Sequence, residues 1–195
     1  MAKPKKKKLN LKGIVVVIIL AVLVLLYYYH LSNKQAPPSE DEYVQSTAVQ
    51  EVLGRNLIVN YPPTPREVVR YYSEISKCFY NEEYTEEELE ELAKQAQGLY
   101  DDDLIANKSW EQYLEDLRID IQTFEQLNYT IESYSLSSSI DIENSKFKQD
   151  GYEWARVYCN YTLRQGTERI YTSEVFILRK DEDGHWKIFG WDLAD

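Results

Sequence analysis

The sequence predicts an α+β protein in which an apolar N-terminal segment precedes one globular domain. Three observations support this. Residues 13–29 read GIVVVIILAVLVLLYYY and contain no charged side chain. Between residues 47 and 126, apolar residues recur every three or four positions behind residues that can cap helices, which indicates helices. After Asn128, Tyr, Thr, Ile and Val alternate with polar residues, which indicates strands. Helices followed by a run of antiparallel strands are typical of the α+β class.

The apolar segment is predicted to form an N-terminal transmembrane helix over residues 13–31. At about 1.5 Å per residue, about 20 residues cross the hydrocarbon core of a bilayer. Six lysines precede the segment, and no Asp or Glu occurs before Glu40. Because positive charge marks the cytoplasmic side, we expect a cytoplasmic tail over residues 1–12 and a single-pass cell-membrane protein with an extracytoplasmic C-terminal domain. The lipid bilayer is the expected partner of this helix.

A cleaved signal peptide is the alternative for the same segment. Its apolar region would be only about 7 to 15 residues long and would end at a small-x-small cleavage site. Here Ala36 has Lys34 two residues before it and Pro37 directly after it, which disfavours cleavage. The sequence therefore predicts a retained signal anchor, followed by a polar, proline-containing linker over residues 32–42.

The charge of the remaining chain argues against nucleic acid as a partner. The protein has 22 Lys and Arg against 33 Asp and Glu, and 22 − 6 = 16 basic residues remain after the N-terminal lysines, so the net charge of the rest is −17. Such a domain repels phosphate backbones. The acidic runs at residues 86–91 and 101–103 lack the spacing of a calcium-binding loop. They are predicted to be solvated surface, and no metal is expected.

Capping signals predict the helices. Each start is a Ser or Thr followed three residues later by Glu or Gln, the pattern of a capping box. The helices so predicted begin after Thr47, Thr64, Thr85 and Ser109. Pro65 suits the first position of the second helix. The last three are the longer ones, so about three helices are expected to pack on the sheet.

Four strands are predicted near residues 129–143, 152–164, 169–180 and 185–193. The dipeptides at residues 150–151, 165–166 and 183–184 are Asp-Gly, Gln-Gly and Asp-Gly, which are hairpin signals. Neighbouring strands should therefore be antiparallel. The expected fold is a layer of helices on one face of a curved four-stranded antiparallel sheet.

Residues 176–188, FILRKDEDGHWKI, resemble the closing hairpin of the nuclear transport factor 2-like, or cystatin-like cone, superfamily. The resemblance implies an NTF2-like cone over residues 43–195, closed by the N-terminal helices. It implies no single function, because the superfamily includes isomerases, dehydratases and binding modules. The layout, with the runs at residues 63–67 and 77–82, also resembles single-pass membrane proteins of Clostridia-type bacteria. No activity comes with that resemblance.

Cys78 and Cys159 form a candidate disulfide. Cys78 follows Ile75 by three residues on a helical apolar stripe, and Cys159 lies on the apolar side of the second predicted strand. Both should face the interface between helices and sheet. Buried free cysteines are as familiar as disulfides in such places, so both states remain open.

The outer face of the sheet is the candidate interface. Alternation along the second strand turns one set of side chains away from the helices. That outward set is Tyr152, Trp154, Arg156 and Tyr158. Trp, Tyr and Arg are enriched among residues that dominate binding interfaces, so a second copy of the chain or a protein partner could bind here. The alternative is that Arg156, Arg164 and the C-terminal tail cover this face within one chain.

No catalytic constellation is found in the sequence. His30 adjoins the apolar segment and His185 lies in a predicted turn, so neither is placed for proton transfer inside a cone. The sequence therefore predicts a non-enzymatic, membrane-anchored interaction module without a cofactor. The alternative is a carrier or sensor that binds a small apolar ligand in the cone, which an open pocket would favour.

Overall fold

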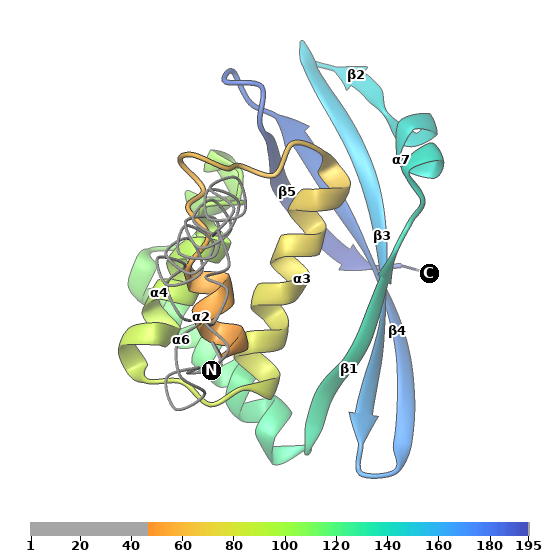
Figure 1. The fold of residues 1–195 in the computed structure, drawn as a ribbon. Coiled ribbons are helices and arrows are strands. Elements are labelled where there is room, and N and C mark those ends of the chain that lie inside the picture. The colour runs from red at the N-terminus through yellow and green to blue at the C-terminus, as the bar shows by residue number, and fades with distance from the viewer. Residues whose placement is uncertain (1–46, 195) are drawn as a thin grey trace, which may run out of the picture. The chain divides into compact units, whose positions relative to one another are not determined.

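Helices α2, α3, α4 and α6 lie on one side of a twisted antiparallel sheet in the computed structural model, which describes residues 47–194 (Figure 1). The helices are α2 (Ala48–Leu53), α3 (Pro65–Asn81), α4 (Glu86–Gln97), α5 (Asp102–Ile105), α6 (Trp110–Gln126) and α7 (Ser139–Ser145). The strands are β1 (Tyr129–Leu136), β2 (Phe147–Gln149), β3 (Tyr152–Gln165), β4 (Glu168–Lys180) and β5 (Trp186–Leu193).

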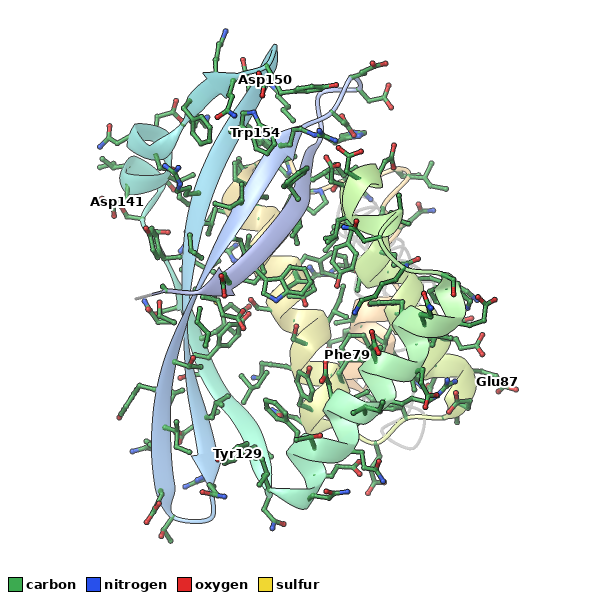
Figure 2. All side chains as sticks on the ribbon, turned by 180° about the vertical axis from the view of Figure 1, so that it is seen from behind. Phe79, Glu87, Tyr129, Asp141, Asp150 and Trp154 are labelled. Carbon is green, nitrogen blue, oxygen red and sulfur yellow. The ribbon has the colours of Figure 1, made fainter. Side chains whose placement is uncertain are left out.

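The four predicted helix starts are confirmed. Thr47, Thr64, Thr85 and Ser109 are the N-caps of α2, α3, α4 and α6. Three of these starts are complete capping boxes. At α3 the Thr64 side chain accepts the Glu67 N–H, but the Glu67 carboxylate binds Arg70 at 2.8 Å instead of reaching back to the cap. The Glu-rich face of α4 points to solvent, as Figure 2 shows for Glu87, while Phe79 of α3 lies inside the domain.

The sheet has the order β1-β3-β4-β5, and all its neighbours are antiparallel. The hairpin of β3 and β4 forms the centre of the sheet. The pairing shifts by one residue between Ile131 and Ser133 of β1 and again between Ile177 and Leu178 of β4. Such irregularities bend and twist a sheet, which gives the inner face its curvature.

The prediction of four strands is wrong, because the sheet contains a fifth strand, β2, which pairs with the start of β3. The expected strand over residues 129–143 ends at Leu136. The side chain of Ser138 then accepts the Asp141 N–H and caps α7, which buries Ile142. A serine-rich stretch therefore starts a helix where alternation alone indicated a continuing strand, because a serine hydroxyl is a good N-cap.

Two serines replace the missing strand beside the middle of β3. Between its pairings with β1 and β2, this edge of β3 lies along α7. The Ser137 hydroxyl accepts the Tyr158 N–H at 2.8 Å. The Ser145 hydroxyl accepts the Arg156 N–H at 3.1 Å, and its one proton has two acceptors within reach, the carbonyls of Ile142 at 2.8 Å and Arg156 at 3.0 Å. The backbone groups of β3 are thus satisfied by side chains where no strand is present.

Replacing Ser145 with Ala should lower the free energy of unfolding by about 1–2 kcal/mol, because the hydrogen bond accepted from the Arg156 N–H and the one donated by the hydroxyl are both lost. Urea unfolding of the wild-type and variant domains measures this difference. Ser135→Ala, at an exposed position of β1, is the matched control and should change stability by less than about 0.5 kcal/mol. Equal effects of the two changes would contradict the assigned role of Ser145.

The prediction of a transmembrane helix is corrected. Within residues 47–194, no helix combines the length and the apolar character needed to cross a membrane. The longest helices there, α3 and α6, have 17 residues each and contain several charged side chains. The predicted span at residues 13–31, the tail at 1–12 and the linker at 32–42 lie outside the described residues.

A buried ion pair joins the segment after α4 to the sheet. Asp101 is only 3% exposed, and its carboxylate accepts hydrogen bonds from Arg179 of β4 at 2.8 Å (Nε) and 2.5 Å (Nη2). Its backbone N–H donates to the carbonyl of Ile188 in β5. The prediction of a solvated acidic run is therefore wrong at Asp101, because this carboxylate caps α5 and binds Arg179.

Asp101→Asn should destabilise the domain by about 2–4 kcal/mol, because it removes the buried counter-charge of Arg179 and leaves only the exposed carboxylate of Asp103, 2.8 Å from Nη2. The exposed neighbour Asp102 offers the control, since Asp102→Asn should cost less than about 0.5 kcal/mol. Thermal unfolding followed by circular dichroism compares the two. A loss below about 1 kcal/mol for Asp101→Asn would show that the pair contributes no more than a surface salt bridge.

Candidate functional site

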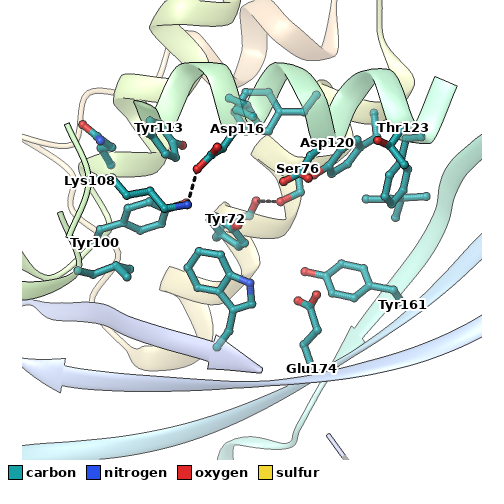
Figure 3. Close-up of a pocket in the computed structure, with 18 of the residues that line it drawn as sticks. Tyr72, Ser76, Tyr100, Lys108, Tyr113, Asp116, Asp120, Thr123, Tyr161 and Glu174 are labelled. Carbon is teal, nitrogen blue, oxygen red and sulfur yellow. Dashed lines mark hydrogen bonds and ion pairs between the residues drawn. The ribbon is translucent and has the colours of Figure 1, made fainter. Parts of the chain in front are cut away.

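An open cavity of about 580 Å³ lies between α3, α6 and the inner face of the sheet (Figure 3). Helix α3 contributes the first wall, α6 the second, and the strands form the floor. The side chains that matter for its chemistry are Tyr72, Ser76, Tyr80, Tyr100, Lys108, Tyr113, Asp116, Asp120, Tyr161, Thr172, Glu174 and Trp191. Half of these are aromatic, and the polar groups converge among them.

Four aromatic rings form one end of the cavity. The ring centroid of Tyr72 lies 6.0 Å from that of Tyr100 and 5.5 Å from that of Trp191. Tyr100 is also 5.7 Å from Trp191 and 6.1 Å from Tyr113. These are normal separations for tilted and edge-to-face pairs. Trp191 pairs with Phe176 on the inner face of the sheet, yet it is 39% exposed, so its ring faces open space in the cavity.

Glu174 of β4 is the carboxyl group on the floor of the cavity. It pairs across the strands with buried Cys159, and its side chain points into the cavity beside the hydroxyl of Tyr161 (Figure 3). No residue between 47 and 194 donates a hydrogen bond to it, and burial alone raises the pKa of Glu174 to about 7. A carboxyl group that titrates near neutrality can exchange a proton or balance a cation under ordinary conditions.

The other polar groups come from the walls, the rim and the floor of the cavity. Asp120 of α6 faces the cavity, and burial together with the nearby Asp116 raises its pKa. Lys108 at the rim binds Asp116, with 2.5 Å between Nζ and Oδ2. The Tyr161 hydroxyl lies 3.0 Å from the hydroxyl of Ser73. Burial raises the pKa of Tyr72 and Tyr161 far enough for both phenols to stay neutral at any ordinary pH.

The model of a family described as a domain of unknown function (DUF6715) matches residues 1–191. The chain belongs to this family. No curated protein matches it. The description of the DUF6715 family names no activity.

The four residues of the candidate interface lie on the outer face of the DUF6715 sheet. They alternate along β3 with residues that face the helices. Tyr158 is 46% exposed and Tyr152 is 38% exposed. The Arg179 guanidinium lies 4.7 Å from the ring centroid of Tyr152 and 5.7 Å from that of Trp154. Arg156 lies over the ring of Phe147 at 4.9 Å. Arginines of the same chain therefore cover part of this face, and the main one is Arg179 rather than Arg164.

The two cysteines of the candidate disulfide are free thiols in the structure, and both are buried. Cys159 lies 3.6 Å from the hydroxyl of Ser73 on α3. Burial raises the pKa of Cys78 to about 11 and also raises that of Cys159. Both sulfurs are therefore protonated at neutral pH and are weak nucleophiles.

The β4–β5 turn brings together the only grouping of possible metal ligands in residues 47–194. Ligand atoms of Asp181, Asp183 and His185 lie within 4.8 Å of one another. Asp181 also accepts the backbone N–H of His185 at 2.7 Å, and Asp183 is exposed. Hydrogen bonding within the hairpin accounts for this arrangement.

Sequence reasoning missed Glu174 and Asp120. Glu174 lies on the same face of the strand as Phe176 and Leu178. The sequence left open whether this face, or the face that carries Val175 and Ile177, lies against the helices. The structure buries Phe176 and Leu178 completely, which places Glu174 on the inner face as well. A carboxylate among inward strand positions is the signal that could have revealed the site.

The raised pKa of Glu174 predicts a specific dependence of stability on pH. The ordinary pKa of Glu is 4.5, so between about pH 4.5 and pH 7 the folded state holds a proton that the unfolded state has lost. The free energy of unfolding should therefore fall as the pH rises through this window, by about 1–3 kcal/mol for this group. Glu174→Gln should remove that contribution, so its stability relative to wild type should increase from pH 5 to pH 8.

Urea unfolding at pH 5, 6, 7 and 8 measures the difference between variant and wild type. Glu168→Gln, at an exposed position of the same strand, is the control and should show a constant difference. A constant difference for Glu174→Gln as well would mean that Glu174 has an ordinary pKa.

Proposed function

We propose that this protein is a binding module that holds a small, largely apolar molecule in the cavity between α3, α6 and the sheet. The observation that carries the proposal is the open cavity of about 580 Å³ with its aromatic wall. Ligand pockets typically measure about 300–1,000 Å³ and combine apolar walls with a few directed polar groups. The cavity matches both properties.

The aromatic lining supports this role energetically. Burying apolar surface contributes roughly 25 cal/mol per Å², and a ligand in this cavity would contact the rings of Tyr72, Tyr100, Tyr113 and Trp191. Their packing on each other restrains the rings before a ligand arrives. A pre-organised pocket spends less of its binding energy on ordering side chains.

The cavity is a better candidate for the binding surface than the outer face of the sheet, which the sequence favoured. The outward aromatic residues Tyr152 and Trp154 already contact Arg179, which is itself bound to Asp101. A protein partner would compete with these contacts. The cavity, in contrast, offers aromatic surface that no side chain of residues 47–194 fills.

The neutral fluorophore N-phenyl-1-naphthylamine tests the proposal, because its emission increases in apolar surroundings. We expect wild-type protein to bind one molecule per chain. Thr172→Trp adds an indole to the cavity and should weaken binding at least about tenfold. The matched control Ser173→Trp adds the same side chain at the neighbouring position, which pairs with exposed Asn160. This control should leave binding unchanged.

Circular dichroism establishes that both variants are folded. Absence of saturable binding to wild type, or equal binding by the two variants, would overturn the proposed function.

A further inference from the structure

We propose that the ligand of the cavity is an organic cation, an ammonium group on an apolar body, and that Glu174 is its counter-ion. This inference rests on the proposed function, because it assigns a chemical class to the occupant of the same cavity. It stands on three observations: the aromatic faces, the balance of charge in the lining and the unpartnered carboxylate.

The aromatic faces provide the first argument. A cation within about 6 Å of a ring centroid is attracted by the electrons of the ring face, and Trp and Tyr are strong partners. The rings of Tyr72, Tyr100 and Trp191 lie within 6.0 Å of one another. These rings pack on one another, so an ammonium group would lie over the side of the cluster that faces the cavity, near more than one ring, and the rest of the ligand would contact apolar walls.

The charge of the lining provides the second argument. Among the described residues that line the cavity, Asp116, Asp120 and Glu174 are acidic and Lys108 is the only basic one. Full ionisation gives 3 − 1 = 2 negative charges in excess. Lys108 is bound to Asp116 and also acts on Asp120, whose pKa it lowers, whereas Glu174 has no cationic neighbour in the lining. An anionic ligand beside Glu174 would meet repulsion.

The unpartnered carboxylate provides the third argument. The groups that face Glu174 are Tyr72 and Tyr80 from α3, Cys159 and Tyr161 from β3, and Leu193 from β5, with Asp120 across the cavity on α6. None is cationic at neutral pH. Glu174 is half-buried, and a carboxylate that is partly withdrawn from water without a partner is costly. An ammonium ion beside it reduces that cost.

Proton linkage follows from this geometry. A cation beside Glu174 favours its ionised form and lowers its pKa. Binding should therefore release a proton near neutral pH. The affinity for a cation should increase as the pH rises from 5.5 to 8, whereas the affinity for a neutral molecule of the same shape should not.

Phenyltrimethylammonium and its neutral isostere tert-butylbenzene provide a matched pair of ligands. Each displaces N-phenyl-1-naphthylamine from wild-type protein at pH 5.5 and pH 8. We expect the cation to bind at least about tenfold more tightly than the isostere at pH 8, with a smaller advantage at pH 5.5. In Glu174→Gln most of this advantage should be lost, and in the control Glu168→Gln it should persist.

The outcomes separate the two proposals. If the fluorophore and tert-butylbenzene bind but the cation has no advantage, the organic cation is wrong and the proposed pocket function stands. If the cation keeps its full advantage in Glu174→Gln, the assigned counter-ion is wrong. If neither the fluorophore nor the pair of ligands binds, the proposed function itself fails. Binding of the fluorophore by Glu174→Gln shows that the variant is folded.

Discussion

The close approach of α3 to the sheet is the constraint on which the rest of the structure depends. Small inner-face residues allow it: Ala155, Val157 and Cys159 are fully buried, and the sulfur of Cys159 lies 3.6 Å from the hydroxyl of Ser73. Glu174, the cross-strand partner of Cys159, and Tyr161, two residues after Cys159, line the open space between the sheet and α6. The size of the side chains along one face therefore determines both where the domain is packed and where it is hollow.

Much of the fold could be predicted because local signals determine it. Hydroxyl caps such as Thr85 and Ser109 start helices through their own hydrogen bonds, and the hairpin glycines Gly151, Gly166 and Gly184 all have positive φ. The stretch from Ser137 to Ser145 could not be predicted in the same way. Its serines satisfy the edge of β3, which is distant in sequence, and only the paired strand shows why a helix replaces a strand there.

The site was harder to predict because it depends on which face of a strand turns inward. Both faces of β4 carry apolar residues, so alternation could not distinguish Phe176 from Val175 as the buried partner. Asp101 shows the same difficulty: a run of three aspartates looks solvated until Arg179, 78 residues later, is placed beside the first of them. Cavities and buried ion pairs arise from contacts between elements, and the local pattern of a sequence does not contain them.

Glu174 is the half-buried carboxyl group that faces the aromatic cavity, and no hydrogen bond from residues 47–194 reaches it. A ¹³C NMR titration of the Glu side-chain carboxyl carbons, assigned with Glu174→Gln, measures its pKa directly. We expect a pKa of about 7 for Glu174 in the free protein and a lower value when phenyltrimethylammonium is added. A free value near the ordinary 4.5, or a value that the cation leaves unchanged, would show that Glu174 is not the counter-ion of a ligand in this cavity.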